Sequence, residues 1–278
     1  MITDSQTNFL YLADTLPKNK KYQNFYQEFE KVLNKHNINF QILPNTKDVW
    51  AVDYMPIQIA QNKFVRFVYN PPYLQSKLWL KSISDTDAIC EQIGIETIKS
   101  NILIEGGNVT RTTDKVIMTD RIFSDNPTYE RKRLIKELCE LFQVDKLFLV
   151  PQQPHDFTGH SDGMVRFIDE QTVIINDYSC EKKEFSSAFE DAIHNTGLDY
   201  IKIPYNPSDK YREAIGDYIN YLQMDNIVIM PTYGLKEDDE VEKQFEQLFS
   251  GQTILRVDGN EIAKDGGVFN CITWNILK

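Results

Sequence analysis

Apolar residues along this chain follow two alternating patterns. Short continuous or alternating apolar runs, typical of strands, lie between longer stretches in which apolar residues recur every three or four positions, as in amphipathic helices. Helices are predicted over residues 22–35, 85–92, 128–142, 184–195 and 238–249. A strand-like run follows each of them, at residues 38–43, 96–106, 146–151, 199–204 and 253–257. This end-to-end alternation favours an α/β fold over separate helical and sheet domains.

Pairs of strand-like runs, joined by short polar turns, also lie between the helices. The pairs cover residues 49–61 with 63–69, 101–114 with 115–120, and 163–170 with 172–178. The repeating unit is therefore strand, strand, helix, strand. Five helices in 278 residues give a repeat of about 55 residues, which suggests modules arranged around a centre. No linker rich in proline, glycine or serine interrupts the pattern, so we expect one domain over residues 1–278.

The composition indicates a folded, acidic protein. Hydrophobic residues make up 41% of the chain, far above the level of disordered proteins. The 41 acidic and 30 basic residues give a net charge of −11, which repels nucleic acid and anionic membranes but not a small cation. No apolar run reaches the roughly 20 residues of a membrane span, and the first residues lack the pattern of a signal peptide. We expect a cytoplasmic protein, with homo-oligomerisation left open.

Four cysteines are widely spaced and form no Cys-x-x-Cys pair, which disfavours a zinc knuckle and a disulfide framework. Cys90 and Cys139 lie in predicted helices, where a small buried side chain explains them. Cys180 precedes a charged segment and is expected in a loop. Cys271 differs, because it follows a glycine-rich turn and heads the last strand-like run. Glycines let a ligand approach the backbone closely, as a nucleophile requires.

His160 is the candidate base, because a pKa near neutrality lets an imidazole accept and release a proton in one cycle. It lies in a loop before a strand that begins near Met164, and Asp162 follows two residues later. On an extended chain these two side chains point to the same side, where the carboxylate would bind a cation. His155 and Asp156 could join them as metal ligands. No helical His-Glu-x-x-His motif is present, so we expect no metal and no cofactor.

Two acidic residues interrupt or end apolar runs. Asp53 lies within the strand-like segment VWAVDYMPIQ, where an unpaired buried carboxylate would cost several kcal/mol. A cationic partner is therefore expected. Glu105 ends the run NILIE and precedes two glycines, a position at which strands deliver site residues into the clefts of α/β proteins.

Taken together, these residues resemble the guanidine-modifying, or pentein, superfamily, and in particular its branch of agmatine deiminases and bacterial peptidylarginine deiminase-like proteins. The family segment W-x-R-D-x-G-P is matched by WAVDYMP at residues 50–56. The family segments EGG and H-x-D-G are matched at residues 105–107 and 160–163, and C-I-T is matched at 271–273 after a glycine-rich turn. The segments MTDRIFSDNP and PTYG are also similar, and the resemblance covers about residues 45–278.

The resemblance implies five pseudo-symmetric ββαβ units around a central active site, and a hydrolase that converts a guanidinium group to a ureido group. Cys271 would attack the guanidinium carbon, ammonia would leave, and water would hydrolyse the thiouronium. Asp53 and Asp162 would clamp the guanidinium nitrogens, and Glu105 would orient His160. His160 would first protonate the leaving ammonia and later activate water.

The resemblance leaves the substrate tail open. Trp50 and Gly267 would also contact the substrate, which is a small cationic guanidinium compound, either agmatine-like or arginine-like. Val52 and Met55 stand where the family has arginine and glycine, and the chain is shorter than many agmatine deiminases. Two alternatives share the fold. One is an amidinotransferase, which would pass the amidino group to an amine, and the other is a catalytically silent binding module.

Overall fold

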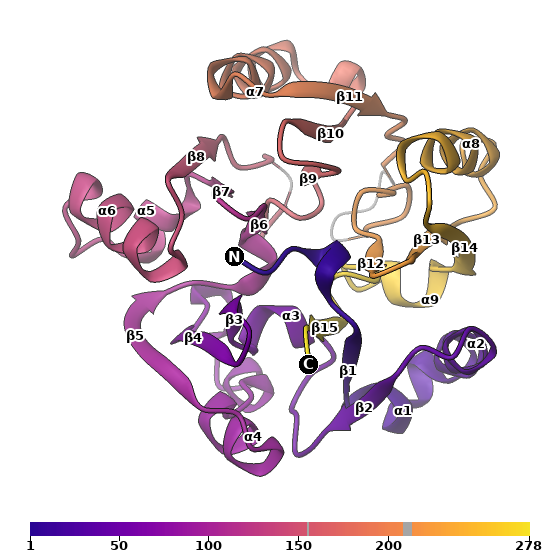
Figure 1. The fold of residues 1–278 in the computed structure, drawn as a ribbon, viewed down its shortest axis with the longest axis horizontal. Helices are drawn as coiled ribbons and strands as arrows, with labels where there is room; N and C mark the ends of the chain where they lie inside the picture. The colour runs from indigo at the N-terminus through magenta and orange to yellow at the C-terminus, as the bar shows by residue number, and fades with distance from the viewer. Residues whose placement is uncertain (155, 208–212) are drawn as a thin grey trace.

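The computed structural model describes residues 1–154, 156–207 and 213–278. Over these residues the strands form five three-stranded sheets arranged in a ring, with the long helices on the outside (Figure 1). In every sheet the central strand pairs antiparallel with one neighbour and parallel with the other. The parallel strand always follows the outer helix, as parallel pairing requires a crossover.

Four of the described modules follow the chain in the order strand, strand, helix, strand. The second module contains β3 (Ile57–Ala60), β4 (Lys63–Val68), α4 (Thr86–Ile93) and β5 (Thr97–Leu103). The third contains β6 (Thr110–Arg111), β7 (Lys115–Thr119), α6 (Arg131–Phe142) and β8 (Lys146–Val150). The fourth contains β9 (Val165–Phe167), β10 (Thr172–Asn176), α7 (Lys183–Thr196) and β11 (Asp199–Ile203). The fifth contains β12 (Leu222–Met224), β13 (Ile227–Thr232), α8 (Asp238–Leu248) and β14 (Thr253–Asp258).

The first module closes the ring, because it takes one strand from the end of the chain. β1 (Phe9–Ala13) pairs antiparallel with β15 (Thr273–Ile276) and parallel with β2 (Phe40–Leu43), which follows α2 (Gln23–Lys35). Figure 1 shows both termini near the middle of the ring. This closure brings the segment that carries Cys271 beside the N-terminal module.

Shorter helices lie in the connections between these elements. The described α-helices of this kind are α1 (Thr15–Lys18), α3 (Ala51–Tyr54), α5 (Arg121–Asp125) and α9 (Asn260–Ala263). The described 3₁₀ turns cover Asp4–Gln6, Lys20–Tyr22, Pro72–Leu74, Trp79–Ser82, Gly106–Asn108 and Tyr178–Cys180. Among the described residues, no helix is long and apolar enough to cross a membrane.

The long helices bury one stripe of apolar residues spaced four positions apart, which places them on one helix face. In α2 the stripe consists of Phe25, Phe29 and Leu33, and in α7 of Phe185, Phe189 and Ile193. Each stripe belongs to an apolar cluster that also contains residues of the neighbouring module, such as Ile229 of the fifth module for α2 and Val150 of the third module for α7. The apolar clusters therefore lie where adjacent modules of the ring meet.

The structure confirms the predicted helices, whose ends shift by three residues or fewer, and the strand pair in the fourth module. Two strand predictions are partly wrong. Residues 51–54 form helix α3, so only the second half of the predicted run at 49–61 is a strand. Residues 101–103 belong to β5, which pairs with β4, and the partner of β7 is only two residues long. Alternating apolar residues in a run do not reveal where the chain bends.

The buried stripe of α2 gives a stability test. The ring of Phe29 is fully buried and lies 5.4 Å from the ring of Phe25 and 5.6 Å from that of Phe269. Phe29→Ala should lower the free energy of unfolding in urea by about 3–5 kcal/mol, because it leaves a cavity. Ile98→Ala, at a side chain that is 44% exposed, should cost less than about 1 kcal/mol. Equal losses in the two variants would contradict this description of the core.

Candidate active site

A cavity of about 1210 Å³ is lined by loops from successive modules of the ring. The predicted residues Asp53, His160, Asp162 and Cys271 all line it, as do Trp50 and Gly267. Glu105 lies behind His160, where it lines a separate small pocket. The structure therefore brings together residues that are far apart in the sequence, such as Asp53 and Cys271, which are 218 positions apart.

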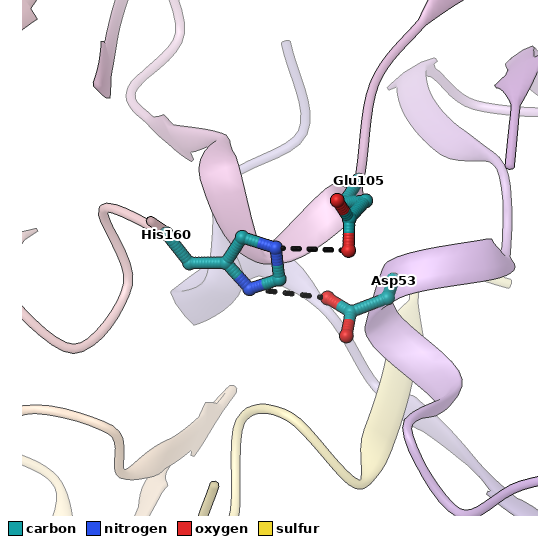
Figure 2. A group of neighbouring side chains, drawn as sticks. All are labelled: Asp53, Glu105 and His160. Atoms are coloured by element: carbon teal, nitrogen blue, oxygen red, sulfur yellow. Dashed lines mark ion pairs between the residues drawn. The ribbon is translucent and has the colours of Figure 1, made fainter. Parts of the chain in front are cut away.

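His160 lies between two carboxylates that approach opposite nitrogens of its ring (Figure 2). Its Nδ1 is 3.6 Å from Asp53 Oδ1, and its Nε2 is 3.2 Å from Glu105 Oε2. The second contact has the distance of an ion pair but not the angle of a hydrogen bond, so Nε2 has no hydrogen-bond partner within the described part of the chain. The backbone N–H of His160 donates to Asp156 Oδ2 at 3.1 Å.

This surrounding charge keeps the imidazole protonated. Burial alone lowers the pKa of His160, but the charges of Asp53 and Glu105 outweigh it and raise the pKa to about 10. His160 is therefore the cationic partner that the sequence analysis predicted for Asp53. Burial raises the pKa of Asp53 well above its ordinary range, and the nearby carboxylates of Glu105 and Asp162 add to this, while His160 opposes it.

Glu105 is held by two side chains that sequence reasoning did not single out, Tyr73 and Arg121 of the segment MTDRIFSDNP. The hydroxyl of Tyr73 donates to Glu105 Oε2, and Arg121 Nη2 lies 3.7 Å from Glu105 Oε1. The guanidinium of Arg121 also lies 5.4 Å from the centre of the Tyr73 ring. Glu105 follows β5 at the start of a 3₁₀ turn, so the strand end and these two partners position its carboxylate.

Cys271 lies in a turn just before β15, and its thiol donates to Asp162 Oδ2 at 3.6 Å. Burial raises the pKa of this thiol well above 9.0, and the negative charges of Asp162 and Asp53 raise it further. The pKa of Asp162 is also raised, mainly by burial, although His160 and Asn270 oppose the shift. Without a cation in the cavity, the sulfur is therefore a protonated thiol at neutral pH.

Two asparagines shape the turn that presents Cys271. Asn220 Oδ1 accepts from the backbone N–H groups of Val268 and Cys271, both at 3.3 Å. Asn270 Nδ2 donates at 2.6 Å to the same Asp162 oxygen that accepts from the thiol. Sequence reasoning missed both asparagines. Asn270 is adjacent to Cys271 in the sequence and could have been noticed, but Asn220 lies in another module and gives no local signal.

Glycines and backbone contacts join the elements of the site. A Cβ atom at Gly107 would lie 2.6 Å from His160 Nδ1 and 2.8 Å from Asp53 Oδ1, too close for any side chain. A Cβ at Gly267 would lie 2.6 Å from the Trp50 ring and 3.0 Å from Cys271 Sγ. The N–H of Gly107 donates to Asp53 Oδ1, and its carbonyl accepts from the N–H of Asp162. Gly107 and Gly267 thus leave room for these side chains to meet, and the close approach of a ligand beside Cys271 stays a prediction.

The cluster at residues 155–162 differs from the sequence expectation in detail. Residues 161–164 form a turn rather than an extended chain, so the same-side argument for His160 and Asp162 is wrong. Both side chains nevertheless line the cavity. Asp156 does not act as a free ligand, because it accepts from Thr158 and from the His160 backbone. His155 lies outside the described residues.

Asp53, Glu105 and His160 could also hold a metal ion, because each offers a donor atom within 4.8 Å of the others. Imidazole and carboxylate donors suit zinc. A metal ligand must be unprotonated, however, and His160 has a pKa of about 10. A metal would therefore compete with a proton that both carboxylates stabilise. The expectation of metal-free chemistry stays a prediction.

Comparisons with known proteins agree on the kind of protein that this chain resembles. The model of the Porphyromonas-type peptidyl-arginine deiminase family matches residues 2–276. A Mycoplasma mycoides subsp. mycoides protein, provisionally assigned as an agmatine deiminase, is 24% identical over 97% of this chain and 86% of its own length.

Solved structures show the same fold. An agmatine deiminase variant from C. jejuni with substrate bound has a TM-score of 0.83 at 20% sequence identity, covering 100% of this chain and 96% of that one. Dimethylarginine dimethylaminohydrolase from Pseudomonas aeruginosa has a TM-score of 0.58 at 10% identity, covering 97% and 99%. These likenesses confirm the pentein fold that the sequence motifs implied.

The charge on His160 can be measured directly. Its imidazole should titrate with a pKa of about 10 in NMR spectra. Glu105→Gln should lower that pKa, because it removes one of the negative charges that offset the effect of burial on the imidazole. Since the pKa is raised from 6.5, the charged imidazole stabilises the fold fully below pH 6.5, and this contribution is lost as the pH rises through about 10. A His160→Gln variant identifies the signal. A wild-type pKa near 6.5 would contradict the proposed ion pairs.

Proposed function

The chain belongs to the Porphyromonas-type peptidyl-arginine deiminase family, and from this premise we propose that it hydrolyses a small cationic guanidinium compound to a ureido product and ammonia. Deiminases are hydrolases that act on carbon–nitrogen bonds. One observation carries the proposal. A buried thiol, a protonated imidazole and the carboxylates of Asp53 and Asp162 meet at one cavity, and the raised pKa values of all three acidic groups would fall if a cation entered.

Asp53 and Asp162 bind the guanidinium from the cavity walls in this proposal. A planar guanidinium presents N–H donors in a fixed geometry that matches two carboxylates. Asp162 Oδ2 already faces Cys271 Sγ at 3.6 Å, so a guanidinium bound to Asp162 lies next to the sulfur. Trp50 and Gly267 line the cavity beside the same sulfur, where a flat ligand fits against the indole ring.

The bound cation also activates the nucleophile. The negative charges that hold the thiol pKa above 9.0 are balanced once the guanidinium is bound, so Cys271 releases its proton to the solvent in the cavity. The thiolate then forms a bond to the guanidinium carbon. His160 donates its proton to one nitrogen of the adduct, the carbon–nitrogen bond breaks, and ammonia leaves from a thiouronium intermediate.

The second half of the cycle returns the proton to His160. The neutral imidazole accepts a proton from water, and the oxygen adds to the thiouronium carbon. The carbon–sulfur bond then breaks and the hydroxyl proton passes to the departing sulfur, which regenerates the thiol and releases the ureido product. Glu105 and Asp53 stabilise the protonated imidazole at both ends of the cycle, and Tyr73 and Arg121 position Glu105. Asn220 and Asn270 position the nucleophile and its carboxylate neighbour.

Product analysis tests this function and separates it from the amidinotransferase alternative. The purified protein should release ammonia and ureido product from agmatine, arginine or an arginine peptide without an added amine, and a chelator should leave the rate unchanged. Transfer that requires an acceptor amine, with no ammonia released, would replace deimination with amidino transfer. A cytoplasmic location, a single domain and any homo-oligomer stay predictions.

Cys271 should react selectively with a cationic reagent. Chloroacetamidine and chloroacetamide have the same size, but only the first is a cation that Asp53 and Asp162 attract. The ratio of the chloroacetamidine rate to the chloroacetamide rate should be at least about tenfold higher at Cys271 than at the exposed thiol of Cys180. Peptide mass spectrometry measures both sites in one sample. Inactivation through Cys90, Cys139 or Cys180, or equal relative rates, would rule out this role for Cys271.

Removing one carboxylate charge should weaken the reaction. Asp53→Asn and Asp162→Asn keep the side-chain shape but leave a guanidinium incompletely paired in a buried site. Each should lower kcat/KM at least about tenfold. Steady-state assays on the best substrate measure the loss, and urea unfolding checks that the fold is intact. Wild-type kcat/KM in either folded variant would remove that aspartate from the guanidinium site.

A further inference from the structure

Asn220, just before β12, binds every backbone N–H of the turn that carries Cys271. Its side-chain Oδ1 accepts from the N–H groups of Val268 and Cys271, both at 3.3 Å. Its backbone carbonyl accepts from the N–H groups of Phe269 and Asn270, at 3.1 and 3.2 Å. Asn220 is only 2% exposed, yet it lines the cavity. One buried residue therefore determines where the sulfur lies.

These bonds also fix the direction of the side-chain amide. Two N–H donors require an acceptor, so the amide oxygen faces the turn and the NH₂ group is left as a donor. The backbone on either side is held as well. The N–H of Asn220 donates to Asp217 Oδ1 at 3.3 Å, and the carbonyl of Tyr221 accepts from Arg166 Nη1 at 3.1 Å. The amide cannot turn over without losing its bonds to the turn.

The remaining donor of Asn220 acts on Asp162 and on the sulfur of Cys271. Asp162 Oδ2 lies 3.6 Å from Cys271 Sγ, and burial raises the pKa of both groups. The side-chain hydrogen bond of Asn220 opposes this rise in each of them, and the N–H of Val268 does the same for the thiol. A hydrogen-bond donor favours the charged form of the group that it faces. The donor of Asn220 is therefore placed to bind a thiolate.

Holding the turn does not by itself explain the amide. An aspartate at this position would accept the same backbone hydrogen bonds, but it would remove the donor and add a negative charge. The charges that act on the thiol are those of Asp162 and Asp53, and both oppose its ionisation. The hydroxyl of Tyr233 also senses the charge of the sulfur. A neutral donor offsets part of this opposition.

We propose that Asn220 is a catalytic residue whose side-chain NH₂ group donates a hydrogen bond to the thiolate of Cys271. Together with the N–H of Val268 it forms a pocket of neutral donors for the negative sulfur. Reactive cysteines are commonly activated by a neighbouring cation, but a fixed cation at this position would repel the guanidinium. Oriented dipoles stabilise the thiolate without that repulsion. The role rests on the proposed function, in which the thiolate attacks the substrate.

Asn220→Leu removes the donor without adding a charge. Chloroacetamidine reacts with the thiolate, so the pH at which its reaction with Cys271 is half-maximal reports the ionisation of the sulfur. Asn220→Leu should raise this pH by about one unit or more, which is at least about tenfold less thiolate at neutral pH, because the lost bond favoured the charged form. Asn220→Asp retains the acceptor oxygens and should also raise it. Peptide mass spectrometry follows the labelling, and circular dichroism checks the fold.

Two matched variants serve as controls. Asn275→Leu removes another buried amide, four residues after Cys271, whose Nδ2 binds Thr7 and Gln223. Asn206→Asp adds a carboxylate at an exposed position of the cavity wall. Neither should raise the half-maximal pH. An equal rise in either control would overturn the proposal.

The limiting rate at high pH separates this role from a purely structural one. If Asn220 only held the turn, its variants would lower the limiting rate and keep the half-maximal pH of the wild type, and the proposal would fail. The labelling needs no turnover, so it also separates the proposal from the proposed function. The predicted shift in a protein that deiminates no guanidinium compound would contradict the proposed function alone.

Discussion

The balance of buried charge around His160 and Cys271 determines how this structure can work. Asp53, Glu105 and Asp162 are all at least nine-tenths buried, and they face one protonated imidazole and one thiol. Burying several carboxylates together is unfavourable unless cations balance them. His160 balances two of them, and a bound guanidinium would balance the rest. The same field that attracts the substrate also keeps the nucleophile protonated until the substrate arrives.

The ring fold is what allows such a concentration of charge. The charged side chains come from three connections of the ring: Asp53 from the one after β2, Glu105 from the one after β5, and His160 with Asp162 from the one between β8 and β9. The carbonyl of Cys271 accepts from the N–H of Val52 in α3, and Gly107 bridges Asp53 and Asp162 through its backbone. Closure of the first module by β15 places the turn that carries Cys271 beside α3.

Periodicity predicted the helices and the repeating unit, and short motifs pointed to several of the residues that line the cavity. Neither predicted the contacts made across the ring. Helix α3 was read as a strand because its apolar residues alternate, although its direction is set by packing against the turn of Cys271. Asn220, Tyr73 and Arg121 were not singled out because their roles depend on partners that are distant in sequence.

Trapping the reaction in acid tests the central claim most directly, because the account requires a covalent bond between the guanidinium carbon and one sulfur. Rapid acid quenching during turnover, followed by peptide mass spectrometry, should find the mass of the substrate minus ammonia on the peptide that contains Cys271. Unmodified Cys90, Cys139 and Cys180 in the same sample serve as internal controls. Turnover with no adduct on Cys271 at any quench time, or an adduct on another cysteine, would contradict the account.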